Sequence, residues 1–69
     1  MVPLTLSIFE AGVVLGLGRQ AAYRAASEGE IPTIKLRTLR VPVAKLAEKF
    51  GPISDERIKD AIELAARVV

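Results

Sequence analysis

The 69-residue chain contains no cysteine, no histidine and no tryptophan. Without cysteine there are no disulfides and no thiol nucleophiles, and without histidine the usual zinc and iron ligand sets cannot be assembled. The carboxylates Glu28 and Glu30 lie close in sequence, but without an imidazole, a thiol or a metal cluster they do not suggest a catalytic pair. We therefore expect no enzymatic activity, no metal and no cofactor.

Long hydrophobic runs are also missing. No apolar stretch approaches the roughly 20 residues that a helix needs to span a bilayer. The first nine residues lack the basic start and extended apolar segment of a signal peptide. Because about half of the residues, 51%, are hydrophobic, a folded chain is expected rather than a disordered one. These features predict one cytoplasmic domain over residues 1–69, with no membrane partner.

Positive charge is concentrated in the middle of the chain. Residues 19–49 contain seven lysines and arginines against three glutamates, a net charge of +4. Residues 1–18 contain a single acid, and residues 50–69 contain three basic and four acidic side chains. A basic block between nearly neutral ends indicates a polyanionic partner.

Capping and glycine signals predict two consecutive short helices in the first half of the chain. Ser7 and Glu10 have the spacing of a capping box, which predicts a helix that runs to about residue 15. A tight connection over residues 16–18 contains two glycines, and a second helix is expected over residues 19–28. Two short helices with so short a connection are typical of a helix-turn-helix.

The second half predicts a β-hairpin and two further helices. The hairpin strands are expected over residues 31–36 and 39–41, with Arg37 and Thr38 at the tip. A third helix is expected over 42–50, with Pro42 in its first turn, and an amphipathic fourth helix over 54–69. The fold class is therefore mainly α with a small β-hairpin. The apolar face of the last helix comprises Ile58, Ala61, Ile62, Ala65, Val68 and Val69.

Ten apolar residues are expected in the core: Ile8, Ala11, Leu15, Leu17, Ile31, Ile34, Leu36, Val41, Leu46 and Phe50. Phe9 and Val13 form a second apolar stripe on the first helix, which a minimal two-helix pair leaves uncovered. The simplest partner is the apolar face of the C-terminal helix. Packing within one chain is favoured because the connecting turn is short, and exchange between protomers is the alternative.

The second helix carries the side chains that point most directly to function. One side is built from alanines, and the opposite side presents five polar groups: Arg19, Gln20, Tyr23, Arg24 and Ser27. Arginine can bind guanine and glutamine can bind adenine through two hydrogen bonds each, while tyrosine and serine hydroxyls commonly bond phosphate. This pattern predicts a helix that reads duplex DNA. The alternative is the solvated face of an ordinary amphipathic helix.

The hairpin adds further basic side chains beside that helix. Lys35, Arg37 and Arg40 surround a tip that contains Thr38, and no acid lies between Glu30 and Glu48. Such a hairpin can act as a wing that places arginine beside or inside a minor groove. The alternative is a surface hairpin whose charges discourage edge pairing. On the third helix, Lys45 and Lys49 either contact phosphate or only face solvent.

Several segments together resemble the excisionase-type winged helix-turn-helix, which is similar to the DNA-binding half of MerR-type regulators. The resemblance covers residues 4–50, and Gly18 stands where the family usually has a Ser or Thr helix cap. It implies a major-groove helix that contains Arg19, Gln20, Tyr23 and Arg24. It also implies a wing around Arg37, Thr38 and Arg40 that contacts the adjacent minor groove or the backbone. Residues 54–69 would be an added C-terminal helix. The matching segments are Leu6–Ala11, Leu15–Arg19, Tyr23-Arg24, Glu28–Pro32 and Leu39–Pro42 leading into Leu46.

The resemblance implies an excisionase, an architectural factor that binds and bends attachment-site DNA and helps a phage integrase to excise a prophage. Cooperative self-association on DNA and a place on the nucleoid of a bacterial host would follow. A small MerR-like transcriptional regulator is one alternative. A second is a module that binds protein rather than DNA, such as an antitoxin-like partner, because the aliphatic content is high. A ligand-sensing domain and a small-molecule ligand are not expected.

Overall fold

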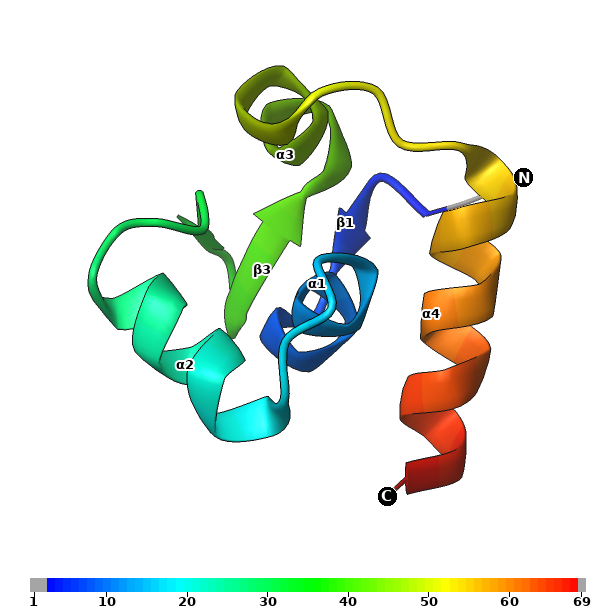
Figure 1. Cartoon of the computed structure of the whole chain (residues 1–69). Coiled ribbons are helices and arrows are strands. Elements are labelled where there is room, and N and C mark those ends of the chain that lie inside the picture. The colour runs from blue at the N-terminus through cyan, green and yellow to red at the C-terminus, as the bar shows by residue number, and fades with distance from the viewer. Residues whose placement is uncertain (1–2, 69) are drawn as a thin grey trace.

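The computed structural model describes residues 3–68, apart from the side chain of Val68. Over these residues the chain forms four helices and a three-stranded antiparallel sheet, so the expected mainly helical class with a small hairpin is confirmed (Figure 1). None of the described helices is long and apolar enough to cross a membrane. In chain order the elements are β1 (Thr5–Leu6), α1 (Ile8–Val14), α2 (Arg19–Ser27), β2 (Ile34–Lys35), β3 (Leu39–Pro42), α3 (Val43–Phe50) and α4 (Asp55–Val68).

The sheet has the strand order β1-β3-β2, with β3 in the centre. The β2–β3 hairpin was expected and is present, with Ile34 opposite Arg40 and Lys35 opposite Leu39. Strand β1 was not expected. It pairs with β3 through Leu6 opposite Val41, and two residues are too short to show the alternation by which a strand is recognised in a sequence.

The capping box at the start of α1 is confirmed. The backbone N–H of Glu10 donates to Ser7 Oγ (3.0 Å), and the backbone N–H of Ser7 donates to Glu10 Oε1 (2.9 Å). After α1, Gly16 takes a φ of 80°, a left-handed conformation that favours glycine and lets the chain reverse direction. Helix α2 then begins after Gly18, which is its N-cap and supplies no side-chain hydrogen bond.

Helix α1 is the centre of the molecule, with α2 packed on one side and α4 on another (Figure 1). The contact with α2 is especially close at Gly12. A Cβ added at Gly12 would overlap the Cβ of Ala22, so only glycine lets the two helices approach this far. Because Ala22 is fully buried, this contact fixes where α2 lies on α1.

The core only partly matches the expected one. Five of the expected core residues are buried, namely Ile8, Ala11, Ile31, Val41 and Leu46, and Leu15 and Leu17 are half-buried against them. Three assignments were wrong, because Ile34, Leu36 and Phe50 are 41%, 62% and 48% exposed. They lie on the hairpin and at the end of α3, at the periphery of the molecule, where no second layer formed by residues 3–68 covers them. Leu6 and Val14 are buried instead.

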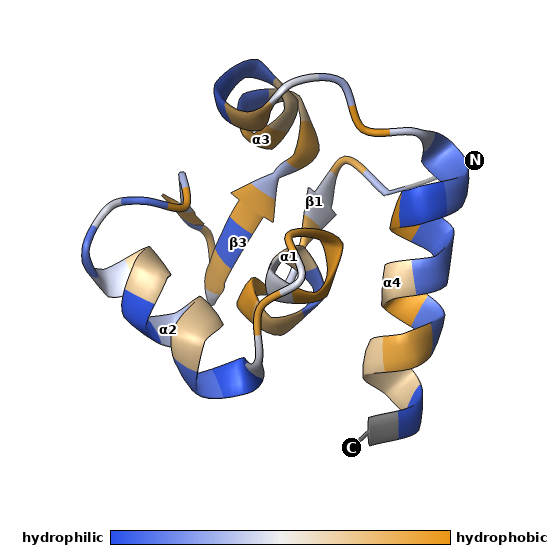
Figure 2. Ribbon diagram, viewed as in Figure 1, coloured by the Kyte–Doolittle hydropathy of each residue, from blue (hydrophilic) through white to orange (hydrophobic). Residues whose placement is uncertain are grey.

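The predicted packing of the C-terminal helix within the chain is confirmed. Ile58, Ala61 and Ala65 of α4 are buried, and Val13 and Ile62 are half-buried against the core. Figure 2 shows the apolar residues of α4 on the side toward α1 and hydrophilic residues on the outer side. The expected face also included Val68 and Val69, whose side chains lie outside the described residues.

A long side chain ties the start of α4 to the end of α1. The guanidinium of Arg57 donates two hydrogen bonds to the carbonyl oxygen of Val14, from Nε (3.1 Å) and Nη2 (2.8 Å). The last carbonyl groups of a helix have no partner within the helix. Arg57 therefore caps α1 from a position 43 residues away in the chain.

Candidate nucleic-acid interface

The polar side of α2 faces outward, as its sequence predicted. Arg19, Gln20, Tyr23, Arg24 and Ser27 are all exposed. On the alanine side, Ala22 is buried and Ala25 and Ala26 are half-buried, whereas Ala21 is exposed and was expected to be packed. The helix therefore rests on α1 through small side chains and presents its long polar side chains to solvent.

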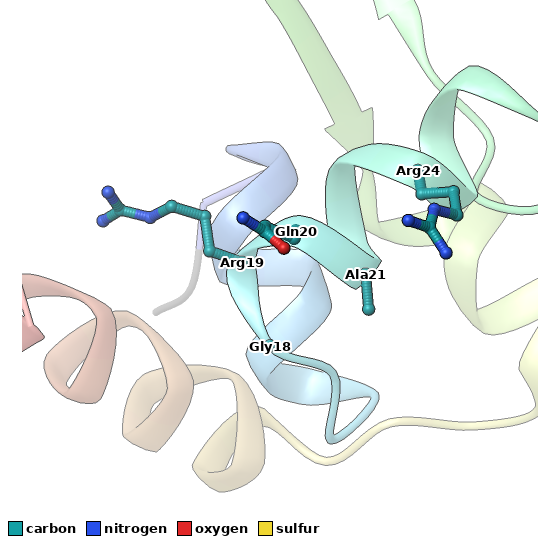
Figure 3. A pocket seen from close by; sticks show the side chains of 5 residues that line it. All are labelled: Gly18, Arg19, Gln20, Ala21 and Arg24. Carbon is teal, nitrogen blue, oxygen red and sulfur yellow. The ribbon is translucent and has the colours of Figure 1, made fainter.

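A shallow surface hollow surrounds the start of α2 and is lined by Gly18, Arg19, Gln20, Ala21 and Arg24 (Figure 3). Arg19 and Gln20 belong to the first turn, and Arg24 follows in the next turn. Gly18 has no side chain, and a Cβ added there would meet nothing within 4 Å. Two guanidinium groups and a carboxamide therefore border an open surface that a large partner can reach.

The guanidinium of Arg19 lies over an aromatic ring of α1. Its Cζ atom lies over the ring of Phe9, 4.6 Å from the ring centroid, within the range of a cation–π interaction. Sequence reasoning paired Phe9 with the C-terminal helix, because a helical wheel gives the direction of a side chain and not its neighbour. The structure instead places the Phe9 ring where it limits the directions that the Arg19 side chain can take.

The hairpin presents three of its four predicted contact residues. Lys35, Arg37 and Thr38 are exposed, whereas Arg40 is half-buried. Arg40 donates to Thr5 Oγ1 from Nε and to the Thr5 carbonyl oxygen from Nη2, each at 3.3 Å. The guanidinium of Arg40 therefore holds β3 to β1 and, unlike the other three side chains, has hydrogen-bond partners within residues 3–68.

Helix α2 and the hairpin meet on one surface. Tyr23 of α2 lines a second hollow together with Thr38 and Leu39 of the hairpin and with Ser7 and Ile8. Of the predicted contact residues, Tyr23 is therefore brought next to Thr38 and Arg40, which also lines this hollow, whereas Arg19, Gln20 and Arg24 line the separate hollow at the start of α2. Ser27 differs from the other polar residues of α2, because its hydroxyl donates a hydrogen bond to the carbonyl oxygen of Arg24 (2.8 Å). Its proton is therefore not free to bond a partner.

Among residues 3–68, the ion pairs lie away from this surface. They join Lys45 to Glu48 (3.9 Å) and Arg67 to Glu63 (2.9 Å), on α3 and α4. Lys49, on α3, donates to the carbonyl oxygen of Gly29 (3.3 Å). In the described part of the chain, the cations of α2 and the hairpin tip, namely Arg19, Arg24, Lys35 and Arg37, are therefore not neutralised by acidic side chains.

Comparisons of the chain with models of known protein families, with characterised proteins and with solved structures found no match. The resemblance to excisionases stays a prediction. A function is therefore inferred from the exposed side chains of α2 and the hairpin and from their geometry.

Proposed function

We propose that the protein is a winged helix-turn-helix that binds duplex DNA. Helices α1 and α2 form the helix-turn-helix, α2 enters the major groove, and the β2–β3 hairpin is the wing. The observation that carries the proposal is that Tyr23 of α2 lines one hollow with Thr38 of the hairpin, on two elements whose exposed cations Arg19, Arg24, Lys35 and Arg37 are unpaired with acids in the described part of the chain. A surface with this charge pattern suits a row of phosphates.

The dimensions of α2 suit a major groove. An α-helix with its side chains is about 10–12 Å across, and the major groove is about 12 Å wide, so α2 fits it with its nine residues, roughly 13 Å of helix at 1.5 Å per residue. In helix-turn-helix proteins the first residues of the second helix reach the base edges. Arg19 and Gln20 occupy that turn and carry the groups that bind guanine and adenine. Tyr23 and Arg24 follow in the next turn, where phosphate contacts are expected.

The hairpin would contact the minor groove and the phosphates next to the major groove in which α2 lies. Lys35, Arg37 and Thr38 are exposed around its tip, and Thr38 lies beside Tyr23. Because Arg40 is bonded to Thr5, its role in this proposal is to hold the base of the wing. Ser27 is not assigned a phosphate contact in this proposal, because its hydroxyl proton is donated within α2 and phosphate oxygens only accept hydrogen bonds.

A binding experiment with a charge-matched control tests the proposal. Duplexes selected by the protein from a random-sequence pool would be titrated with wild type, with Arg19→Gln/Arg24→Gln and with Lys59→Gln/Arg67→Gln. Both variants lose two positive charges, but only the first loses them from α2. We expect the α2 variant to bind more than about tenfold more weakly, while the α4 variant stays close to wild type. Equal losses in both variants, or no duplex binding by wild type, would refute the proposal.

Within this function we propose the role of an excisionase, on the basis of the sequence resemblance. The protein would bind and bend attachment-site DNA on the nucleoid in the cytoplasm of a bacterial host, bind cooperatively at neighbouring sites and assist a phage integrase. An excision assay on a plasmid, with the integrase of the same element, measures this role directly. A protein that changes transcription from a nearby promoter and leaves excision unchanged would instead be a small MerR-like regulator.

A further inference from the structure

The hairpin exposes aliphatic side chains among its cations. Ile34, Leu36 and Leu39 are all exposed, and Leu36 is the most exposed of the three at 62%. Burial of two of them was expected from the sequence and does not occur. Ile34 and Leu36 are two residues apart in one strand and its continuation, whereas Leu39 stands opposite Lys35, on the other face from Ile34. Exposed aliphatic side chains such as Ile34 and Leu36 can form a contact surface. Their neighbours in the chain, Lys35 and Arg37, show which kind of partner that surface fits.

Leu36 lies where the hairpin turns. Its backbone N–H donates to the carbonyl oxygen of Thr38 (3.1 Å), which closes a tight turn around Arg37. The most exposed leucine of the hairpin is therefore held at its tip, with a cation immediately before it and another immediately after it. The other two residues of the tip, Arg37 and Thr38, are polar and are also exposed.

The two cations favour a polyanionic partner over an apolar protein surface. A hydrophobic surface offers Lys35 and Arg37 no counter-charge, and any loss of water around them would be unfavourable. A DNA minor groove meets both requirements at once. Its walls are rows of phosphates that pair with the cations, and its floor is formed by stacked bases between which leucine side chains are known to be inserted.

Building on the proposed function, we propose that Leu36 is a wedge that enters a base step of duplex DNA through the minor groove. Lys35 and Arg37 bind the phosphates on either side and hold the tip in place. Insertion partly unstacks the step and kinks the duplex toward the major groove of that step. Pyrimidine–purine steps unstack most easily, so the step under the hairpin is expected to be TA or CA.

The test separates wedge insertion from DNA binding. The probe is a duplex selected by the protein from a random-sequence pool, with 2-aminopurine placed at successive steps to report unstacking and with a donor and an acceptor dye at its ends to report bending. Wild type is compared with Leu36→Ala and Leu36→Met. Leu64→Ala serves as the control, because Leu64 is also an exposed leucine (49%) but lies on α4. Thermal unfolding of each variant verifies that it is folded.

We expect wild type to raise 2-aminopurine fluorescence at one step and to shorten the distance between the duplex ends. Leu36→Ala should lose both signals, while its Kd rises by no more than about tenfold because phosphate contacts supply most of the affinity. Leu36→Met and Leu64→Ala should keep both signals.

Two results would overturn the inference and leave DNA binding intact. The first is a Leu36→Ala variant that unstacks and bends the duplex as wild type does, and the second is a wild type that binds without unstacking any step. If wild type binds no duplex at all, the proposed function fails and the wedge fails with it.

Discussion

Gly12 on α1 and Ala22 on α2 are in direct contact, and a Cβ added at Gly12 would overlap the Cβ of Ala22. The contact lies at the crossing of the two helices that we interpret as the helix-turn-helix. It sets how far the exposed side of α2 stands from the body of the molecule. The geometry of the candidate interface therefore depends on a glycine that makes no contact with the proposed partner.

A Gly12→Ala substitution is expected to destabilise the fold. Alanine normally stabilises a helix interior relative to glycine by up to about 1 kcal/mol, but here the added methyl group has no room. Overpacking of this kind costs about 1–3 kcal/mol, so the net effect on the free energy of unfolding should be a loss. Urea denaturation would measure it, and unchanged or increased stability would show that α1 and α2 are not packed this closely.

Gly18→Ser is the matched substitution in which an added side chain has space. Nothing lies within 4 Å of a Cβ at Gly18, and the residue is the uncapped N-cap of α2. A serine hydroxyl can accept a hydrogen bond from a first-turn N–H, and serine is a better N-cap than glycine by a few tenths of a kcal/mol. The same urea denaturation should therefore show a small gain in the free energy of unfolding. A loss would mean that Gly18 is not the N-cap of α2.

The two hydrogen bonds from Arg57 to the Val14 carbonyl predict a stability effect far from the proposed interface. Arg57→Met keeps an unbranched apolar side chain but removes both donors, and hydrogen bonds to charged groups contribute about 1.5–3 kcal/mol. We expect a loss of roughly 1.5 kcal/mol in the free energy of unfolding, with DNA affinity unchanged. Lys59→Met, on the exposed side of the same helix, is the control, and an equal loss there would contradict the assignment.

The stacking of Arg19 on Phe9 predicts an effect on specificity. Phe9→Leu removes the ring that orients the guanidinium, and an exposed cation–π pair contributes about 0.5–1 kcal/mol. The preference for a selected duplex over a random one should fall by about two- to fivefold, and Phe9→Tyr, which keeps a ring, should retain it. Competition binding measures both ratios. A preference that survives Phe9→Leu would show that Phe9 does not position Arg19.

Arg37 and Arg40 are expected to behave differently although they are three residues apart. Arg37 is exposed at the tip, so Arg37→Ala should weaken duplex binding and leave the melting temperature unchanged. Arg40 is bonded to Thr5, so Arg40→Ala should lower the melting temperature and change the salt dependence of binding little. Calorimetry and salt titrations distinguish the two. The reverse pattern would mean that Arg40, and not Arg37, contacts the DNA.

Local signals in the sequence were sufficient to locate the helices. The capping box at Ser7 and Glu10 marked the start of α1, and Gly16 marked its end, because each acts through backbone hydrogen bonds or dihedral angles within a few residues. Strand β1 could not be found in this way. Its pairing with β3 joins residues more than 30 positions apart in the chain, and that partner is visible only in the folded molecule.

The sequence predicted which side chains of the candidate interface are exposed better than it predicted which residues they contact. The exposed side of α2 follows from helical periodicity alone. Arg40 is different, because sequence proximity to Arg37 suggested a shared role, whereas its hydrogen bonds to Thr5 depend on β1. Leu36 was expected in the core because an alternating apolar pattern shows that a strand can be covered, not that another layer is present to cover it.

Duplex binding as a function of salt concentration tests the central claim most directly. If Arg24, Lys35 and Arg37 each neutralise one phosphate and Arg19 neutralises about one phosphate charge from within the groove, the logarithm of the association constant should fall with the logarithm of salt concentration with a slope of about −3 to −4. Arg37→Ala should reduce the magnitude of this slope by about one. An affinity that does not change with salt would contradict the proposal that this surface binds DNA.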